Sequence, residues 1–370
     1  MPDFIDEVMG FDPSNLDAFN EPEGRNYDAN VYKTNPKDTK SEDGNYRSRV
    51  RVIYNPANPK DSIIHQATYF MKSADGGLLV RSRLGNGPVD PDFKNCPIFK
   101  AWKKLWFSGV ESEKERAKSL FDKTEADYVL VQILEDENKP DLVGKFMAMK
   151  LPKAVRVKLE AKMKPSKESK KVPYPAMDYV IGLELNMDVA PGPDDPAKPE
   201  RKQREISYDL CEFGDYAPII QTDGTPLFTE EQIELIDAYV TAIKDSTGAK
   251  TEAKRKAAVN QLEALRPQLR PLYEIAFNYV KENAFDIRED QGWKEWDENT
   301  TKRVNQWIEI VLDGKNPENI TYEDFIAEKK KKEAEKNGGQ GAAGEAPAPA
   351  APEEQVADAF GKAPGEDLPF

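Results

Sequence analysis

The hydrophobic pattern of the chain changes its period near the middle, and this change limits the fold more than any other feature. In the first half, short segments alternate between apolar and polar side chains, which is typical of half-buried strands. The clearest segment is 45–54, where Arg47, Arg49 and Arg51 are predicted to share one face. From about residue 228 onward, apolar residues recur at helical spacing. The pattern predicts a β-rich part followed by a helical part.

Several segments of the first half carry the strand pattern. Residues 128–134 are the strongest of them, and a polar loop predicts that they pair with 142–151 as a hairpin. Because no alternation of strands with helices of the βαβ kind is evident, the segments predict a small antiparallel barrel. The predicted strands span 45–54, 63–71, 77–83, 128–134, 142–151 and 179–189.

Helical patterns occur in both halves. Residues 97–120 have helical spacing, and the charged run at 111–118 continues that helix on an exposed face. A short basic helix is predicted at 152–163, where proline occupies the first turn. In the second half, Thr229 and Gln232 form a capping box that predicts a helix start. The helices predicted there span 233–243, 252–264, 269–283, 301–312 and 322–335.

The composition collapses into Gly, Ala, Pro and Glu after residue 336. Such a segment cannot bury enough apolar surface to offset the entropy of ordering, so disorder is predicted for it. The sequence therefore predicts an α+β protein with short helices in the barrel part. Its predicted parts are an acidic N-terminal arm at 1–44, a barrel core at 45–220, a helical region at 228–336 and a disordered acidic tail at 337–370.

The residue counts exclude several classes of protein. No stretch approaches 18 uninterrupted apolar residues, and the acidic N-terminal sequence lacks the layout of a signal peptide. Two cysteines, Cys96 and Cys211, are too few for a disulfide framework and suit a reducing cytoplasm. Any catalytic triad would have to use the single histidine, His65, which is interpreted as a residue without chemistry. A cytoplasmic protein that is not an ordinary hydrolase is predicted.

The net charge of −14 hides an uneven distribution. Residues 46–174 hold 26 Lys and Arg against 16 Asp and Glu, whereas the remainder holds 27 basic and 51 acidic residues. A basic body with acidic ends is typical of a protein that binds a polyanion and regulates that binding.

Aromatic residues are interleaved with the basic ones. Single-stranded nucleic acid needs this mixture, because cations follow the phosphates while flat side chains stack on the bases. Any one aromatic is at least as often a core residue, so the clustering within one predicted barrel carries the interpretation. The candidate DNA-binding residues are Arg47, Arg49, Arg51, Tyr54, Arg81, Arg83, Lys100, Trp102, Lys103, Lys104, Trp106, Tyr128, Lys145, Phe146, Lys150, Lys153 and Arg156.

The last residues of the sequence form a second candidate site. The segment 337–370 has six acidic residues and one basic residue, and it ends with an apolar phenylalanine. An acidic tether of this kind resembles the tips of bacterial single-stranded DNA-binding proteins, which dock on replication and repair partners. Such a tip is expected to fill a basic-rimmed pocket of a partner. The candidate partner-binding residues are Glu366, Asp367, Leu368, Pro369 and Phe370.

Short motifs between about residues 46 and 219 occur in a familiar order. They are Asn95-Cys96-Pro97, the hairpin of 128–134 with Val143-Gly144-Lys145, Pro152-Lys153, Tyr179-Val180 and Tyr208-Asp209. Their collinear order resembles the core of the helix-destabilising, single-stranded DNA-binding proteins of T-even bacteriophages, over less than half of the chain. The resemblance implies an oligonucleotide-binding barrel (OB-fold) with a basic, aromatic cleft. It also implies a protein that coats strands exposed in replication, recombination and repair.

The resemblance assigns roles to four residues. It places Tyr128 near an aromatic of the cleft, Lys145 and Lys150 on the cleft-side strand of the hairpin, and Lys153 at the head of the basic helix.

The chain departs from that family in three respects. Where the family often has a zinc clip, only Cys96 matches, and Phe99 occupies the position of a second cysteine. His65 and Cys211 do not complete a set of four ligands, so no metal or cofactor is predicted. The arm at 1–44 has 11 acidic and 4 basic residues, whereas the family's arm is basic. The helical region has no clear counterpart.

These observations predict a non-enzymatic single-stranded DNA-binding protein, encoded by a bacteriophage if the resemblance holds. The acidic tail is expected to compete with DNA for the basic cleft. DNA binding is then expected to free the tip to recruit a polymerase, helicase, primase or recombinase. Three alternatives stay open: an interaction scaffold whose barrel is merely structural, an RNA-binding barrel, and a metal-dependent nuclease, which the position of the acidic residues disfavours.

Overall fold

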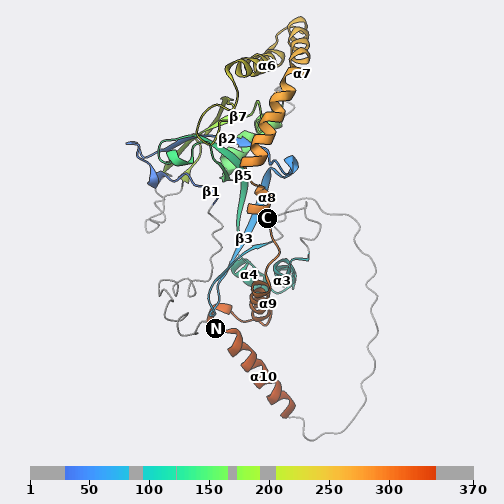
Figure 1. Ribbon diagram of the computed structural model, residues 1–370. Helices are drawn as coiled ribbons and strands as arrows, with labels where there is room; N and C mark the ends of the chain where they lie inside the picture. The colour runs from blue at the N-terminus through green and yellow to red at the C-terminus, as the bar shows by residue number, and fades with distance from the viewer. Residues whose placement is uncertain (1–29, 83–94, 122, 166–172, 192–205, 339–370) are drawn as a thin grey trace, which may run out of the picture. The chain divides into compact units, whose positions relative to one another are not determined.

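The computed structural model describes residues 30–82, 95–121, 123–165, 173–191 and 206–338. The chain divides into two compact units, Met1–Ile320 and Thr321–Phe370. In the first unit, the described residues form a nine-stranded sheet with helices packed against it (Figure 1). The described part of the second unit contains helix α10. The protein is therefore α+β, as the sequence predicts.

The strands follow one another along a curled, largely antiparallel sheet. Neighbouring strands have the order β1-β6-β5-β2-β7-β8, while β3 pairs with β4 and β5, and β9 pairs with β7. Only the short β1–β6 pair is parallel among the described strands. The strands are β1 (Val31–Tyr32), β2 (Tyr46–Ile53), β3 (Ile63–Met71), β4 (Leu78–Ser82), β5 (Lys123–Asp136), β6 (Phe146–Leu151), β7 (Leu183–Pro191), β8 (Ile206–Ser207) and β9 (Glu212–Tyr216).

Strand β5 organises the sheet because it pairs with three other strands. Its residues from Lys123 to Val129 pair with β3, and its residues from Leu130 to Asp136 pair with β2. Between Asp127 and Gln132 the opposite edge pairs with β6. A strand has only two edges, so β3 and β2 must use the same edge of β5 in succession. The sheet therefore divides near Val129 into a β3–β4 ribbon and a β2–β7 part.

The strand predictions are confirmed in the main, and three boundaries differ. Strand β5 extends several residues beyond the predicted 128–134 at its start, where it pairs with β3. Strand β6 begins only at Phe146, after a short 3-10 turn. Strand β7 begins at Leu183 because the carboxylate of Asp178 accepts hydrogen bonds from two following backbone N–H groups and forms a turn there. The short strands β1, β8 and β9 were not predicted.

The described helices are α3 (Pro97–Trp106), α4 (Glu111–Leu120), α5 (Lys153–Met163), α6 (Glu230–Gly248), α7 (Glu252–Asn283), α8 (Ile287–Gln291), α9 (Glu298–Leu312) and α10 (Tyr322–Gly338). The capping box of Thr229 and Gln232 is present at the start of α6. The predicted continuity between α3 and α4 is wrong, because the chain turns at Gly109, whose φ of 80° favours glycine.

Helix α7 corrects a second prediction. The sequence predicts two helices, 252–264 and 269–283, whereas one helix of 32 residues runs through Pro267 and Pro271. Each proline removes one backbone donor from the helix. The carbonyls that lose these donors belong to exposed residues, where water can take the donor's place.

Three clusters of buried residues hold the first unit together. The first lies between the sheet and α5 and includes Val131 and Leu159. The second joins the sheet to α6 and α7 and includes Leu130 and Leu272. The third joins the β3–β4 ribbon to α3, α4 and α9, and it includes Tyr69, Ile98 and Trp307. The helices after residue 228 thus share buried contacts with the sheet, while the predicted domain boundaries stay predictions.

Arg51 follows the alternation of Arg47 and Arg49 along β2, but unlike them it is not exposed. Its side chain is fully buried, and its Nη2 donates to the carbonyl of Asp178 at 2.5 Å. Burial lowers the pKa of Arg51 to about 10, while the charge of Asp178 opposes the shift. A Cβ on Gly182 would come within 3.0 Å of the guanidinium and even closer to backbone, so this turn requires glycine. The alternation of the sequence therefore predicts the face of β2 on which Arg51 lies, but it does not predict the residues that bury its side chain.

Asp136 anchors the segment before β2 to the end of β5. Its buried carboxylate accepts hydrogen bonds from the Tyr32 and Tyr46 hydroxyls at 2.6 and 2.7 Å. It also accepts from the backbone N–H groups of Asn138 and Lys139. Burial and the hydrogen bond to Asp136 raise the pKa of both tyrosines, so both remain donors at neutral pH.

Asp136→Asn is expected to lower the free energy of unfolding by about 2 kcal/mol, because an amide replaces the oxygen that accepts from both hydroxyls. Urea denaturation of the full chain measures the change. The matched control is Asp141→Asn, an exposed carboxylate in the same loop. An unchanged denaturation midpoint for Asp136→Asn would contradict the role of this carboxylate.

Candidate nucleic-acid interface

Cationic side chains gather where β6 ends and α5 begins. Pro152 stops the strand and precedes the first turn of α5, with a φ of −63° that suits this position. Lys150 is exposed at the end of β6, and Lys153 is exposed at the start of α5. Within the described part of the chain neither lysine has an ion pair. Tyr128 is directly opposite Lys150 in the antiparallel pair, so their side chains leave the same face of the sheet.

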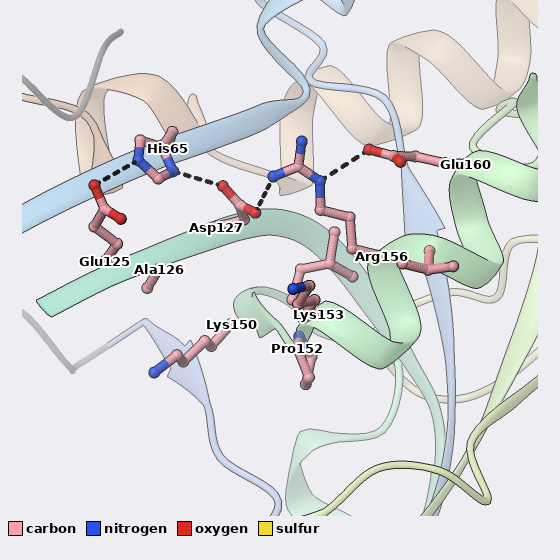
Figure 2. Close-up of a pocket in the computed structure, with 11 residues that line it drawn as sticks. His65, Glu125, Ala126, Asp127, Lys150, Pro152, Lys153, Arg156 and Glu160 are labelled. Carbon is pink, nitrogen blue, oxygen red and sulfur yellow. Dashed lines mark hydrogen bonds and ion pairs between the residues drawn. The ribbon is translucent and has the colours of Figure 1, made fainter. Parts of the chain in front are cut away.

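A pocket of about 430 Å³ lies between α5, β3 and β5 (Figure 2). Lys153, Arg156 and Val157 line it from one face of α5, as their helical spacing requires. His65 lines it from β3 and Asp127 from β5. These two residues are directly opposite each other in the β3–β5 register. The pocket is therefore built where β3 still occupies the edge of β5.

A row of alternating charges forms one wall of the pocket, as Figure 2 shows. His65 Nδ1 lies 2.8 Å from Asp127 Oδ1, and its Nε2 lies 3.6 Å from Glu125 Oε1. Arg156 Nη1 donates to Asp127 Oδ2 at 2.5 Å, and its Nε donates to Glu160 at 2.9 Å. The hydrogen bond to Asp127 raises the pKa of His65, although desolvation opposes it. Burial would raise the pKa of Asp127, but hydrogen bonds from His65 and Arg156 outweigh it and the pKa is lowered.

The second cationic surface lies on α3. Trp102 stacks on Trp106 with ring centroids 5.3 Å apart, and Phe99 stacks on Trp102 at 6.0 Å. At the end of the helix, Phe107 is 63% exposed and meets Trp102 edge to face. The predicted residues Lys100, Lys103 and Lys104 are exposed on the same helix. Lys114 and Lys118 of α4 add cations over the Trp106 ring, at 5.4 and 5.7 Å from its centroid.

One face of β3 extends from the pocket to the helical lobe formed by α3, α4 and α9. His65, Ala67, Tyr69 and Met71 alternate onto that face. Tyr69 and Met71 are buried against α3 in the third core cluster. At roughly 3.3 Å per residue, His65 and Tyr69 are about 13 Å apart along the strand. The pocket and the lobe are therefore neighbours on one side of the β3–β4 ribbon.

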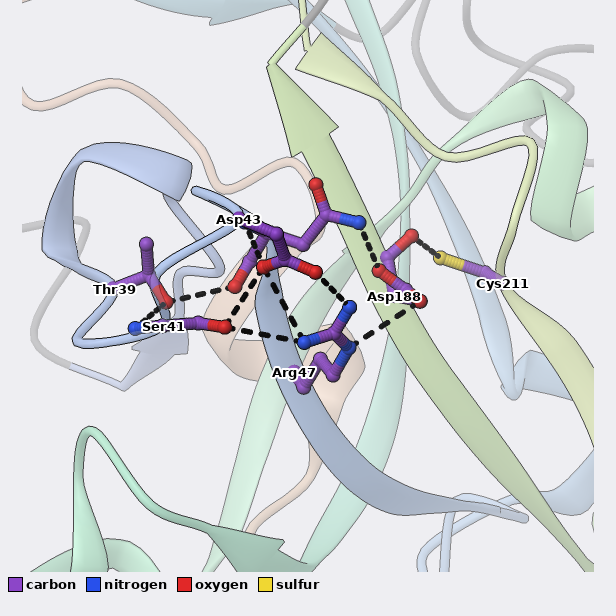
Figure 3. A network of polar contacts seen from close by, with 7 residues as sticks. Thr39, Ser41, Asp43, Arg47, Asp188 and Cys211 are labelled. Carbon is purple, nitrogen blue, oxygen red and sulfur yellow. Dashed lines mark hydrogen bonds and ion pairs between the residues drawn. The ribbon is translucent and has the colours of Figure 1, made fainter.

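Arg47 and Arg49 belong to separate ion-pair networks on β2. Arg47 pairs with Asp43 and lies 3.4 Å from Asp188, as Figure 3 shows. Hydrogen bonds from Arg47 and Ser41 lower the pKa of Asp43 to about 2. Arg49 lies 2.9 Å from a carboxylate oxygen of Glu135 and 3.5 Å from one of Glu184. Each arginine faces two carboxylates, so this part of the surface has little net positive charge.

Other predicted residues contribute to the core rather than to an exposed surface. Phe146 is 7% exposed and contacts Tyr279, with ring centroids 6.2 Å apart. Tyr54 is half-buried and meets Tyr179 edge to face. Arg51 is buried, so an exposed DNA contact by this residue is wrong for the described fold.

The remaining predicted residues divide between described and undescribed positions. Arg81 donates to the carbonyl of Asp290 at 2.7 Å and so holds the end of α8. Lys145 is exposed just before β6. Arg83 lies outside the described residues. The five residues of the C-terminal tip also lie outside them, so their role stays a prediction.

His65 contributes to the pocket, although its sequence context predicts no role for it. His65 was interpreted as a residue without chemistry, whereas it lines the pocket and bonds to Asp127. The two residues are 62 positions apart, and only the β3–β5 register brings them together. The one feature of the sequence that could have indicated a role for His65 is its position as a polar residue within an alternating strand.

The cysteines lie in apolar surroundings. Cys96 is buried with its Sγ 3.3 Å from Ser82 Oγ, and burial raises the pKa of Cys211 to about 11. In the described part of the chain, no group of three or more His, Cys, Asp or Glu side chains could hold a metal ion.

Comparison with protein-family models and with curated proteins finds no match to this chain. Among the described residues, no helix combines the length and the apolar character that crossing a membrane requires.

The imidazole of His65 is expected to titrate above its ordinary pKa of about 6.5, because Asp127 and Glu125 favour its protonated form. Since folding raises this pKa, the stabilisation is fully present below about pH 6.5 and is lost as the pH rises through the folded-state pKa. The chain has one histidine, so a ¹³C–¹H imidazole spectrum follows it without ambiguity.

In the same titration, Asp127→Asn should move the midpoint of His65 downward, because it removes the nearer carboxylate. A wild-type midpoint at or below the ordinary value would show that the carboxylates do not control this imidazole.

Proposed function

We propose that the protein binds single-stranded DNA without sequence specificity and coats strands exposed in replication, recombination and repair. The observation that carries the proposal is the pair of exposed lysines, Lys150 and Lys153, beside the pocket. Arg47, Arg49 and Arg156 bond to carboxylates and Arg81 to a carbonyl, whereas these two lysines have no ion pair within the described residues. Unpaired cations attract phosphates without first breaking an internal contact.

The α3 surface supplies aromatic side chains, which are the second requirement for binding a single strand. Bases stack on exposed aromatic faces, and each such contact contributes about 1–3 kcal/mol whatever the base. The partly exposed rings of Trp102 and Trp106, together with Phe107, lie among the α3 lysines. The α3 surface and the pocket both lie beside β3, and the proposed strand path runs from one to the other.

The sheet supports the finer proposal of an oligonucleotide-binding barrel. Such a barrel needs a strongly bent strand that passes from one part of the sheet to the other. Strand β5 exchanges β3 for β2 along one edge near Val129 and so belongs to both parts of the sheet. The order of motifs that resembles the T-even bacteriophage proteins spans the same strands.

The acidic tail is proposed to regulate binding. Residues 337–370 have an excess of five negative charges, which can compete with DNA for the cations of the basic surface. Strand binding then displaces the tail and leaves Glu366 to Phe370 available to replication or recombination proteins.

Replacing Lys150 and Lys153 together by Ala is expected to weaken binding of a labelled oligo-dT strand about tenfold at low salt. It should also reduce the log–log salt slope by about 1.4, since each phosphate contact contributes about 0.7. Fluorescence anisotropy at several salt concentrations measures both quantities.

The matched control replaces Lys254 and Lys281, which are exposed on α7, and should leave affinity nearly unchanged. Equal affinity of the wild type and the Lys150/Lys153 variant would refute the proposed surface and favour a scaffold. An oligo-U strand in parallel tests the RNA alternative, because a preference for RNA requires contacts to the 2′-hydroxyl.

A version that ends at Lys336 is expected to bind oligo-dT more tightly than the full chain, with the largest gain at low salt, where charge competition is least screened. Competition with duplex DNA in the same assay measures strand selectivity. If removing the tail weakens binding, the tail does not compete with DNA.

A further inference from the structure

The carboxylates of the pocket are already neutralised by neighbouring cations. Glu125 accepts from Lys123 at 2.6 Å and faces His65, while Asp127 binds both His65 and Arg156. Glu160 accepts from Arg156. The charged row of Figure 2 is thus internally paired, and the wall it forms has little net charge of its own.

Two kinds of unused binding capacity remain in the pocket. One is cationic, because Lys153 at its rim has no ion pair in the described part of the chain. The other is apolar. Pro152 lines the pocket, and Val157 of α5 lines it with 56% of its surface exposed. An exposed valine that faces a concave site is a contact surface for an apolar or aromatic group.

A volume of about 430 Å³ is within the range of pockets that enclose small organic ligands. It exceeds what a bare phosphate needs, and a phosphate would leave the apolar lining uncovered. A purely apolar ligand would leave Lys153 without a counter-ion. A nucleotide combines a flat, largely apolar base with an attached anion, and so it uses both capacities.

We infer that this pocket receives a single nucleotide unit of the bound strand, with the base against Pro152 and Val157 and the phosphate at Lys153. This inference rests on the proposed function and adds to it. The strand is not only stacked on an open surface, because one base leaves the stack and enters the protein. His65 and Arg156, fixed by Asp127, form the polar wall that faces the edge of that base.

The test uses His65 of the full chain as a reporter, since it lines the pocket and is the single histidine. The probes are thymidine 5′-monophosphate, thymidine and inorganic phosphate, each added at constant pH and ionic strength. The nucleotide is expected to shift the imidazole ¹³C–¹H signal saturably and at lower concentration than either fragment. An equal response to inorganic phosphate would mean an anion site only, and it would overturn the inference.

Val157→Glu places a charge against the base and should weaken nucleotide binding at least about fivefold, the lower limit expected for loss of one base contact. Val259→Glu makes the same change at an exposed valine of α7 and should have no effect. Circular dichroism confirms that both variants fold. Equal nucleotide binding by the two variants would contradict a base contact at Val157.

Oligo-dT binding separates failure of this inference from failure of the proposed function. If oligo-dT binds through Lys150 and Lys153 but leaves the His65 signal unchanged, the strand passes outside the pocket and only the inference fails. If oligo-dT does not bind at all, the proposed function fails, and the inference fails with it.

Discussion

A β-strand can pair with one neighbour along each edge at any point, and this limit organises the first compact unit. Strand β5 has β6 along one edge, while β3 and then β2 occupy the other. Near Val129 the pairing partner of β5 changes from β3 to β2. Different helices cover the two parts of the sheet that meet there. Helices α3, α4 and α9 cover the β3–β4 ribbon, whereas α6 and α7 pack on the sheet in the second cluster. The pocket is built from β3 and β5 just before they part.

Buried polar groups fix the coverings of the sheet in place. Arg51 donates to a carbonyl in the turn before β7, yet its Nε and Nη1 have no hydrogen-bond partner within the described residues. Asp178 compensates part of that cost through its charge, and it also accepts from the Tyr273 hydroxyl of α7 at 3.1 Å. Such groups add little net stability, because desolvation offsets the attraction. The hydrogen bond of Tyr273 to Asp178 links α7 to the turn before β7.

Local patterns in the sequence predicted local structure well. Residues 63–71 form β3 as predicted, because alternation and flanking turn residues define both ends. The patterns could not predict contacts that depend on register. Arg51 alternates like Arg47, but it lies against the turn at Gly182 and is fully buried. His65 gained a role only through its pairing with Asp127. The exposure of Lys150 and Lys153 was predictable, because a lysine at the end of a strand stays in solvent whatever the distant register is.

The two thiols of the chain are both buried. Two copies of the chain that meet therefore present no thiol to one another, and intermolecular disulfides are disfavoured. A cysteine introduced on the surface would be the one that reacts with a maleimide. The protein thus accepts a fluorophore or spin label at a chosen position without prior removal of its native cysteines.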